Sequence, residues 1–91
     1  MNVAFTDSAL DDLGYWVRNN ARMAKKILEL IELTRRTPYS GLGKPEPLKH
    51  RLAGRWSRRI DDGHRLIYRI VQQNGENILE ISSCRFHYAE R

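Results

Sequence analysis

The spacing of apolar residues along this chain changes once, near Pro38, and this change constrains the fold more than any other feature. Before Pro38, apolar residues at positions 24, 27, 28 and 31 recur as they do on one face of a helix. Beyond Pro47, short apolar runs alternate with polar turns, a pattern typical of hairpin-linked strands. Proline ends the helical part because it has no N–H to donate. Helices followed by such strands predict an α+β fold, with a helical hairpin on one face of a mainly antiparallel sheet.

The expected elements are one strand, two helices and four further strands. Residues 1–5 form the first strand, and Thr6 or Asp7 caps a helix that ends at Asn19 and Asn20. The apolar side chains expected to face the core are Leu10, Leu13, Trp16 and Val17 in the first helix, and Ala24, Ile27, Leu28 and Ile31 in the second. We expect a loop over residues 39–47, strands over 48–52, 55–60, 64–71 and 78–84, and a polar turn over 72–77.

Size and charge fit one small domain with a polyanionic partner. The 91 residues predict a single domain, 1–91, and 16 Lys and Arg against 11 Asp and Glu give a net charge of +5. A basic surface without a particular partner is the alternative interpretation. The single cysteine, Cys84, excludes an internal disulfide, and no apolar run reaches the roughly 20 residues that a membrane span needs. We therefore expect a cytoplasmic protein with no membrane association.

Glu46 is a candidate general base because it lies between Pro45 and Pro47. The two prolines stiffen the backbone, which helps to hold a reacting carboxylate in place. An exposed surface turn is the competing interpretation of these three residues. RNA can be cleaved by its own 2′-hydroxyl, so a protein needs to supply only a base, a stabiliser of the phosphorane and an acid.

Arg59 and Arg65 flank the turn at residues 61–63 and are candidates to bind a phosphate. If three residues form the turn, the two arginines lie opposite each other on one sheet face, where like charges repel unless an anion lies between them. A two-residue turn would shift this register. A solvated charged face, or pairing with the two aspartates of the turn, is the alternative. Lys49 and Arg58 are expected to raise the local positive potential.

His87 is a candidate general acid, since histidine titrates near neutral pH, and Tyr88 follows it. A terminal strand can bring this pair beside the hairpin arginines, whereas an unstructured basic tail is the alternative. His50 and His64 are expected to support the site rather than to react.

The aromatic residues Trp56 and Tyr68 can stack on unpaired bases. Trp56 can equally face the core, and Tyr68 is expected to do so. Cys84 is expected to pack rather than to react. No His/Cys cluster has zinc-binding spacing, and no Gly-rich loop has phosphate-binding spacing. The residues thus predict a small ribonuclease that is independent of metal ions and cofactors.

Taken together, these motifs closely resemble the YoeB toxins of the RelE superfamily over almost the whole chain. The residues that carry the resemblance are Tyr15, Trp16, Lys25, Lys26, Ile27, Arg35 and Arg36, the stretches 37–39, 43–50, 56–60, 64–66 and 84–88, and Gly41, Gly54 and Tyr68. The resemblance implies a RelE-like α+β fold with an N-terminal strand. It also implies a toxin of a bacterial type II toxin–antitoxin system.

The resemblance implies a ribosome-dependent endoribonuclease that cuts mRNA codons in the A site of the 70S ribosome and so stops translation. The implied roles are general base for Glu46, phosphorane stabiliser for Arg65, general acid for His87, and supporting residues at Lys49, Arg59 and Tyr88. The expected products carry a 2′,3′-cyclic phosphate and a 5′-hydroxyl. The implied partner is a YefM-like antitoxin whose partly disordered segment folds on the toxin, and such toxins also tend to form homodimers.

Two features depart from the family pattern: the turn at 72–77 is longer than usual, and residues 89–91 extend past the His-Tyr pair, which leaves the role of the chain end open. Two other functions compete with the nuclease. One is a ParE-like toxin that blocks DNA gyrase, and the other is a non-enzymatic RNA- or ribosome-binding module. The set of Glu46, Arg65 and His87 argues against the gyrase-blocking toxin, because a pure binder needs no acid–base pair. Alanine variants separate the third function, since binding alone would survive the loss of Glu46 and His87.

Overall fold

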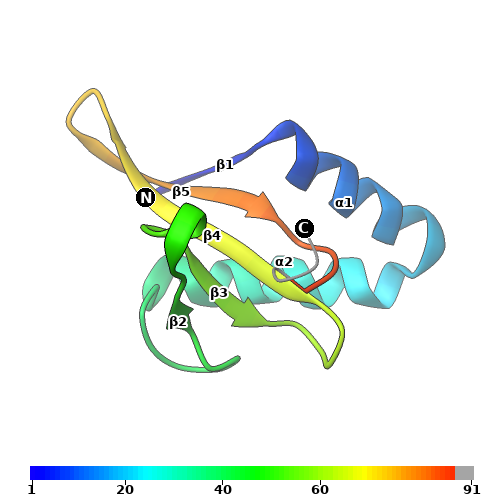
Figure 1. Ribbon diagram of the computed structural model, residues 1–91. Coiled ribbons are helices and arrows are strands. Elements are labelled where there is room, and N and C mark those ends of the chain that lie inside the picture. Colours follow the sequence, from blue (N-terminus) through cyan, green and yellow to red (C-terminus); the bar gives the residue numbers. More distant parts are fainter. Residues whose placement is uncertain (88–91) are drawn as a thin grey trace.

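The computed structural model describes residues 1–87 of the chain. Its elements are β1 (Asn2–Phe5), α1 (Asp7–Asn19), α2 (Ala21–Arg36), β2 (Glu46–Pro47), a short 3-10 helix (His50–Leu52), β3 (Trp56–Arg59), β4 (Arg65–Gln73) and β5 (Glu76–Ser83). The strands form one sheet in the order β1-β5-β4-β3-β2. Only β1 and β5 pair in parallel, and the other neighbours are antiparallel. Figure 1 shows α2 passing behind the strands, so the expected α+β fold is confirmed.

Both helices begin at the caps that the sequence predicts. The Thr6 hydroxyl accepts a hydrogen bond from the Ala9 N–H, and the Asn20 side chain accepts one from the Met23 N–H. Asn20 also terminates α1, because its N–H donates to the Trp16 carbonyl. The two helices therefore follow each other without a linker and must fold back as a hairpin. Neither described helix is long and apolar enough to cross a membrane.

The core lies between this hairpin and the sheet. Its fully buried members include Ala9, Ile27, Leu66, Tyr68, Leu79, Ile81 and Cys84. The expected core positions of Leu10, Val17 and Leu28 are wrong, since these side chains are 58%, 59% and 48% exposed. They flank the buried stripe of their helices, and only a narrow arc of each helix contacts the sheet and the other helix.

The expected strand at 48–52 is also wrong: the 3-10 helix lies there, and the short strand β2 lies just before it, at the end of the expected loop. His50 has a φ of 57°, a left-handed conformation that turns the chain out of an extended path. The N–H groups of Leu52 and Ala53 then donate to the carbonyls of Lys49 and His50. At the other end of the sheet, the polar turn is confined to Asn74 and Gly75, with φ of 53° and 81°, so β4 and β5 are longer than expected.

Candidate active site

A small cavity of about 130 Å³ brings several predicted site residues together. The residues that line it are Gly43, Lys44, Glu46, Ser57, Arg59 and Arg65. The strand register explains this grouping: Glu46 pairs with Ser57 across β2 and β3, and Arg59 pairs with Arg65 across β3 and β4. Ser57 and Arg59 are two residues apart in β3, so both pairs point to the same sheet face. This face is opposite the one that packs on the helices.

The two arginines lie opposite each other, as a three-residue turn predicts. The Ile60 N–H donates to the His64 carbonyl, which leaves residues 61–63 as the turn. Arg59 forms an ion pair with the side chain of Asp62, which is 92% exposed, so pairing with a turn aspartate also occurs. Nη1 of Arg65 donates to the carbonyls of Asp61 and His64 at 2.6 and 3.0 Å. An exposed ion pair contributes little free energy, so a phosphate can replace Asp62 on Arg59 at small cost.

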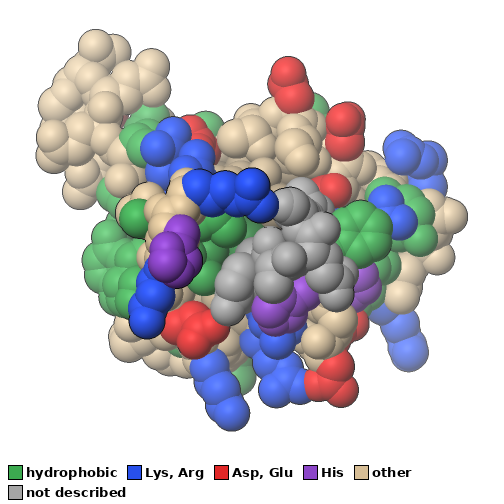
Figure 2. Space-filling model, viewed as in Figure 1, with side chains coloured by type: hydrophobic (Ala, Val, Ile, Leu, Met, Phe, Trp, Pro, Cys, Tyr) green, Lys and Arg blue, Asp and Glu red, His purple; other side chains and the backbone are tan. Residues whose placement is uncertain are grey.

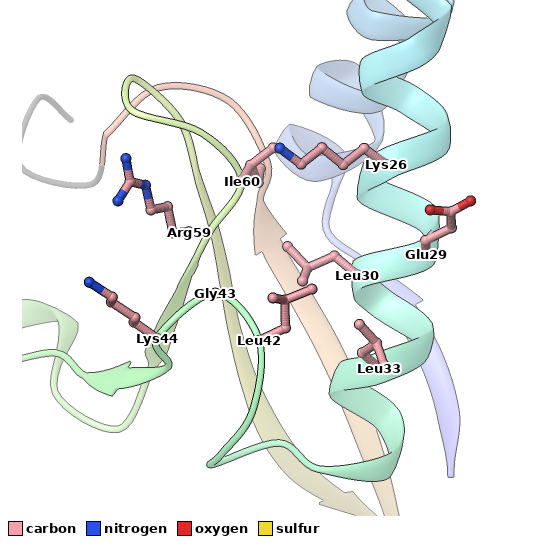
Figure 3. Close-up of a pocket in the computed structure, with 9 residues that line it drawn as sticks. All are labelled: Lys26, Glu29, Leu30, Leu33, Leu42, Gly43, Lys44, Arg59 and Ile60. Atoms are coloured by element: carbon pink, nitrogen blue, oxygen red, sulfur yellow. The ribbon is translucent and has the colours of Figure 1, made fainter.

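The loop that leads to Glu46 separates this cavity from a larger, apolar one of about 440 Å³ (Figure 3). The apolar cavity lies between α2 and the loop, where Leu30 and Leu42 point toward each other. Lys44 and Arg59 border both cavities, and their side chains point away from α2. The loop therefore has an apolar side toward the helix and a cationic side toward the candidate site.

Arg58 does not lie on the cationic face, contrary to the expectation that it raises the local potential there. It is fully buried on the other face of β3, next to the loop that follows α2. Its Nη2 donates to the carbonyls of Thr37 and Ser40, each at 2.6 Å. The hydroxyl of Tyr68, also fully buried, donates to the Pro38 carbonyl. Burial raises the pKa of Tyr68, and the nearby Arg58 charge offsets part of that increase.

The segment that carries His87 is held by its backbone. The Cys84 N–H donates to Oδ2 of Asp12 at 3.0 Å, and the Cys84 carbonyl accepts from Nε1 of Trp16 at 2.9 Å. Two residues later, the Phe86 carbonyl accepts from the Arg65 N–H at 3.0 Å. His87 therefore begins one residue from a backbone contact to the proposed phosphate-binding arginine, and it is half-buried.

The contact between this segment and the hairpin has a second part. The Phe86 N–H donates to Nδ1 of His64 at 2.7 Å, and the His64 ring packs edge-on against Trp16 with centroids 4.8 Å apart. His64 thus supports the segment through its ring, and its supporting role in the reaction site stays a prediction. Cys84 is fully buried, in agreement with a packing role.

The remaining predicted residues fall into three groups. Lys49 and His50 line a separate cavity of about 390 Å³ on the far side of Glu46, so they border the candidate base but not the arginine pair. Trp56 packs against the core and against Tyr39, with ring centroids 4.7 Å apart, so the structure favours the core alternative for this residue. Tyr88 lies outside the described residues.

Lys44 and Ser57 line the small cavity, although the sequence analysis gave neither of them a role. The alternation of β3 could have identified Ser57, because it places Ser57 with Arg59. Lys44 has no comparable signal, since its position depends on a left-handed φ of 50° at the end of the loop. Figure 2 shows that Lys, Arg and His side chains gather over β2, β3 and the C-terminal segment on this face.

Comparisons with known proteins identify the family. A family model described as the YoeB-like toxin of bacterial type II toxin–antitoxin systems matches residues 5–88. Toxin YoeB of Escherichia coli K12 is 49% identical over 88 residues, which cover 97% of this chain and 100% of that protein. The solved YoeB/ParE toxin from Agrobacterium tumefaciens aligns with a TM-score of 0.90 and 50% identity, over 97% of this chain and all of that one.

Staphylococcus aureus YoeB is a third relative, solved as a dimer and in a heterotetrameric complex with YefM. The dimer aligns with a TM-score of 0.81 and 40% identity, and the complex with a TM-score of 0.81 and 39% identity. Both alignments cover 97% of this chain and 98% of the other. The family match and the identities extend over nearly the whole length, and the resemblance read from the sequence is confirmed. The chain belongs to the family of YoeB-like toxins of bacterial type II toxin–antitoxin systems.

Proposed function

We propose that this toxin is a ribosome-dependent endoribonuclease that cuts mRNA codons in the ribosomal A site. The observation that carries the proposal is the cavity in which Glu46, Arg59 and Arg65 meet, with the backbone of the His87 segment bonded to Arg65. A carboxylate beside two arginines suits a reaction that removes a proton next to a phosphate. A toxin that only blocks gyrase, or a module that only binds RNA, has no need for this arrangement.

In the proposed reaction the carboxylate of Glu46 accepts the proton of the substrate's 2′-hydroxyl. The 2′-oxygen then attacks the adjacent phosphorus, and the guanidinium of Arg65, with Arg59 beside it, stabilises the charge of the phosphorane. The bond to the 5′-oxygen breaks, and the imidazolium of His87 donates the proton that this oxygen needs. The products are a 2′,3′-cyclic phosphate and a 5′-hydroxyl.

We assign supporting roles to Lys49, Tyr88 and His50, and we add Lys44. Lys44 lines the cavity with Glu46 and the two arginines, where its charge attracts the scissile phosphate. Lys49 and His50 line the neighbouring cavity beyond Glu46, where the next nucleotide of an extended strand would lie. Trp56 is not included, because it packs against the core and Tyr39.

The proposed partners are the ribosome with its mRNA and a YefM-like antitoxin. The net charge of +5 and the cationic sheet face suit ribosomal RNA, whose phosphates release counterions on contact with Lys and Arg. The Staphylococcus relative binds YefM and also forms a dimer, so we propose an antitoxin of that kind and a toxin homodimer for this chain.

Cleavage of a short mRNA on programmed ribosomes tests the proposed function. Wild-type protein should cut only the codon in the A site, leave a 5′-hydroxyl on the downstream fragment, and spare the same RNA without ribosomes. Inhibition of gyrase supercoiling, in place of RNA cleavage, would identify the ParE-like function instead. Ribosome binding without cleavage would identify the non-enzymatic module.

A further inference from the structure

We propose that Arg58 is a positioning residue for Glu46: its buried guanidinium fixes the loop after α2 in the path that carries the proposed base to the active cavity. Arg58 contacts neither the cavity nor the proposed reacting atoms. The kinetic test of this inference rests on the proposed nuclease function. The contacts that motivate it are seen in the structure and do not depend on that function.

The first contact is with the C-terminal end of α2. Thr37 is the C-cap of that helix, and Nη2 of Arg58 donates to the carbonyls of Thr37 and Ser40 at 2.6 Å each. The last carbonyls of a helix carry partial negative charge and lack partners within the helix. The guanidinium therefore acts as a cationic cap supplied by a strand, and it joins α2 to β3.

The second contact is with the loop further on. A Cβ added to Gly43 would lie 2.5 Å from Cγ of Arg58, so the loop backbone passes directly over the arginine side chain. Gly43 also has a φ of 88°, and its carbonyl accepts from the Arg59 N–H at 2.7 Å. Arg58 thus touches the loop at both ends of residues 37–43. Glu46 enters β2 three residues beyond, opposite Ser57.

Stability alone does not explain a buried arginine here. Nε and Nη1 of Arg58 are buried without a hydrogen-bond partner in residues 1–87, and no carboxylate in that range forms an ion pair with Arg58. A buried charge without a counter-ion loses its hydration, and a well-packed apolar side chain of similar volume is often as stabilising. What an apolar side chain cannot do is bond the carbonyls of Thr37 and Ser40 and so define the loop.

A double-mutant cycle on programmed ribosomes distinguishes a positioning role of Arg58 from a general loss of packing. Arg58→Met should lower the single-turnover cleavage rate by about 10- to 100-fold, because a small misplacement of a reacting group has effects of this size. If Arg58 acts through Glu46, the loss of cleavage rate caused by Glu46→Ala should be about tenfold smaller in the Arg58→Met background than in wild type. His87→Ala is the matched control and should cost the same in both backgrounds.

Two further variants complete the kinetic test. Arg58→Lys keeps a cation with several donors and should recover most of the wild-type rate. If Arg58→Met does not fold, as judged by circular dichroism, Arg58→Gln takes its place, since its shorter side chain removes the charge but stays polar. Equal coupling to Glu46 and His87, or no coupling to either, overturns the proposal.

Backbone amide NMR gives a readout that does not depend on activity. In the Arg58→Lys and Arg58→Met proteins, the amide signals of Gly43, Lys44 and Glu46 should shift more than those of residues 84–87. Shifts of equal size in the two segments overturn the positioning role. If the wild-type protein does not cleave RNA on ribosomes but the amide shifts follow the expected pattern, the nuclease function fails and the positioning of Glu46 stands.

Discussion

The two groups proposed to transfer protons reach the sheet on segments of different construction. Glu46 follows a loop whose carbonyls are held by buried side chains, those of Arg58 and Tyr68. His87 ends a segment whose own N–H and carbonyl groups are bonded to α1 and to the β3–β4 hairpin. The loop is held by side chains that bond its carbonyls, whereas the C-terminal segment is held mainly through its own backbone groups.

Within residues 1–87, the hydrogen bonds described for these two supports come from different residues. The loop depends on β3, β4 and the end of α2, whereas the C-terminal segment depends on Asp12 and Trp16 of α1 and on His64 and Arg65. Changes to one support should therefore leave the other intact, and their effects on stability should add. The comparison also suggests where regulation is easiest, because backbone bonds at a chain end can be displaced one at a time.

The largest expected effect comes from removing either reacting group. Glu46→Ala and His87→Ala should each lower single-turnover cleavage on ribosomes by about 10²–10⁴, the usual loss for a positioned base or acid. The fold should remain, because Glu46 is exposed and His87 lies outside the helices and strands. Glu76→Ala, an exposed carboxylate in the distant β4–β5 hairpin, is the control and should cleave normally. Rates near wild type for both site variants would refute the assigned roles.

Antitoxin binding should show whether the C-terminal segment can be displaced. We expect the antitoxin to place carboxylates on the hairpin arginines or to displace the C-terminal segment. In the first case Arg59→Ala and Arg65→Ala should weaken binding on the order of 10²-fold, because each variant leaves a carboxylate of the antitoxin in the interface without its arginine. In the second case a truncation after Phe86 alters affinity and the arginine variants do not. Calorimetric titration distinguishes the two, and no change in any of these proteins would place the antitoxin elsewhere.

The next effect tests the support of the C-terminal segment alone. Asp12→Ala removes the acceptor of the Cys84 N–H and should lower the free energy of unfolding by about 1–2 kcal/mol. Its neighbour Asp11 is exposed, so Asp11→Ala is a matched control that should unfold like wild type in urea. Amide NMR should show changes in residues 84–87 and none at Gly43, Lys44 or Glu46. A response in both segments would contradict their separate anchoring.

The smallest effect concerns the loop. Tyr68→Phe removes the bond to the Pro38 carbonyl and should lower the free energy of unfolding by about 1 kcal/mol near neutral pH. The pKa of Tyr68 is raised in the folded state, so wild-type stability is complete below pH 10 and falls as the unfolded phenol ionises above it. The Phe variant should lack this alkaline loss. Urea titrations of both proteins at pH 8 and above pH 10 would measure the difference. If the free energy of unfolding changes with pH by the same amount in both, this role of Tyr68 is excluded.

Local signals were sufficient for the helix ends. Thr6, Asn20 and Pro38 act within a few residues of themselves, so these ends could be predicted. The sequence left open whether Arg59 and Arg65 lie opposite each other, because it does not determine the length of the turn, and the structure shows the pairing that a three-residue turn gives. Leu10 and Val17 were wrongly assigned to the core. The spacing of apolar residues identifies the apolar face of a helix, but it does not show how much of that face the neighbouring elements cover.

Arg58 shows where sequence reasoning was insufficient. The alternation of β3 puts Arg58 on the face of Trp56, opposite Arg59, but the charge favoured an exposed position. Its burial depends on carbonyl groups at the end of α2, about 20 residues away in the sequence, and only the tertiary fold brings these together. The 3-10 helix after β2 was missed for a related reason, because the left-handed His50 has no sequence signal of its own.

The bond from the Phe86 N–H to Nδ1 of His64 also determines the tautomer of that ring. An acceptor nitrogen carries no proton, so a neutral His64 holds its hydrogen on Nε2, and a protonated ring cannot accept the bond at all. The nitrogen-15 chemical shifts of His64 therefore report whether the C-terminal segment is hydrogen-bonded to the ring. A ribosome or an antitoxin that withdraws Phe86 should change these shifts, so a single imidazole can report the position of the segment that carries His87.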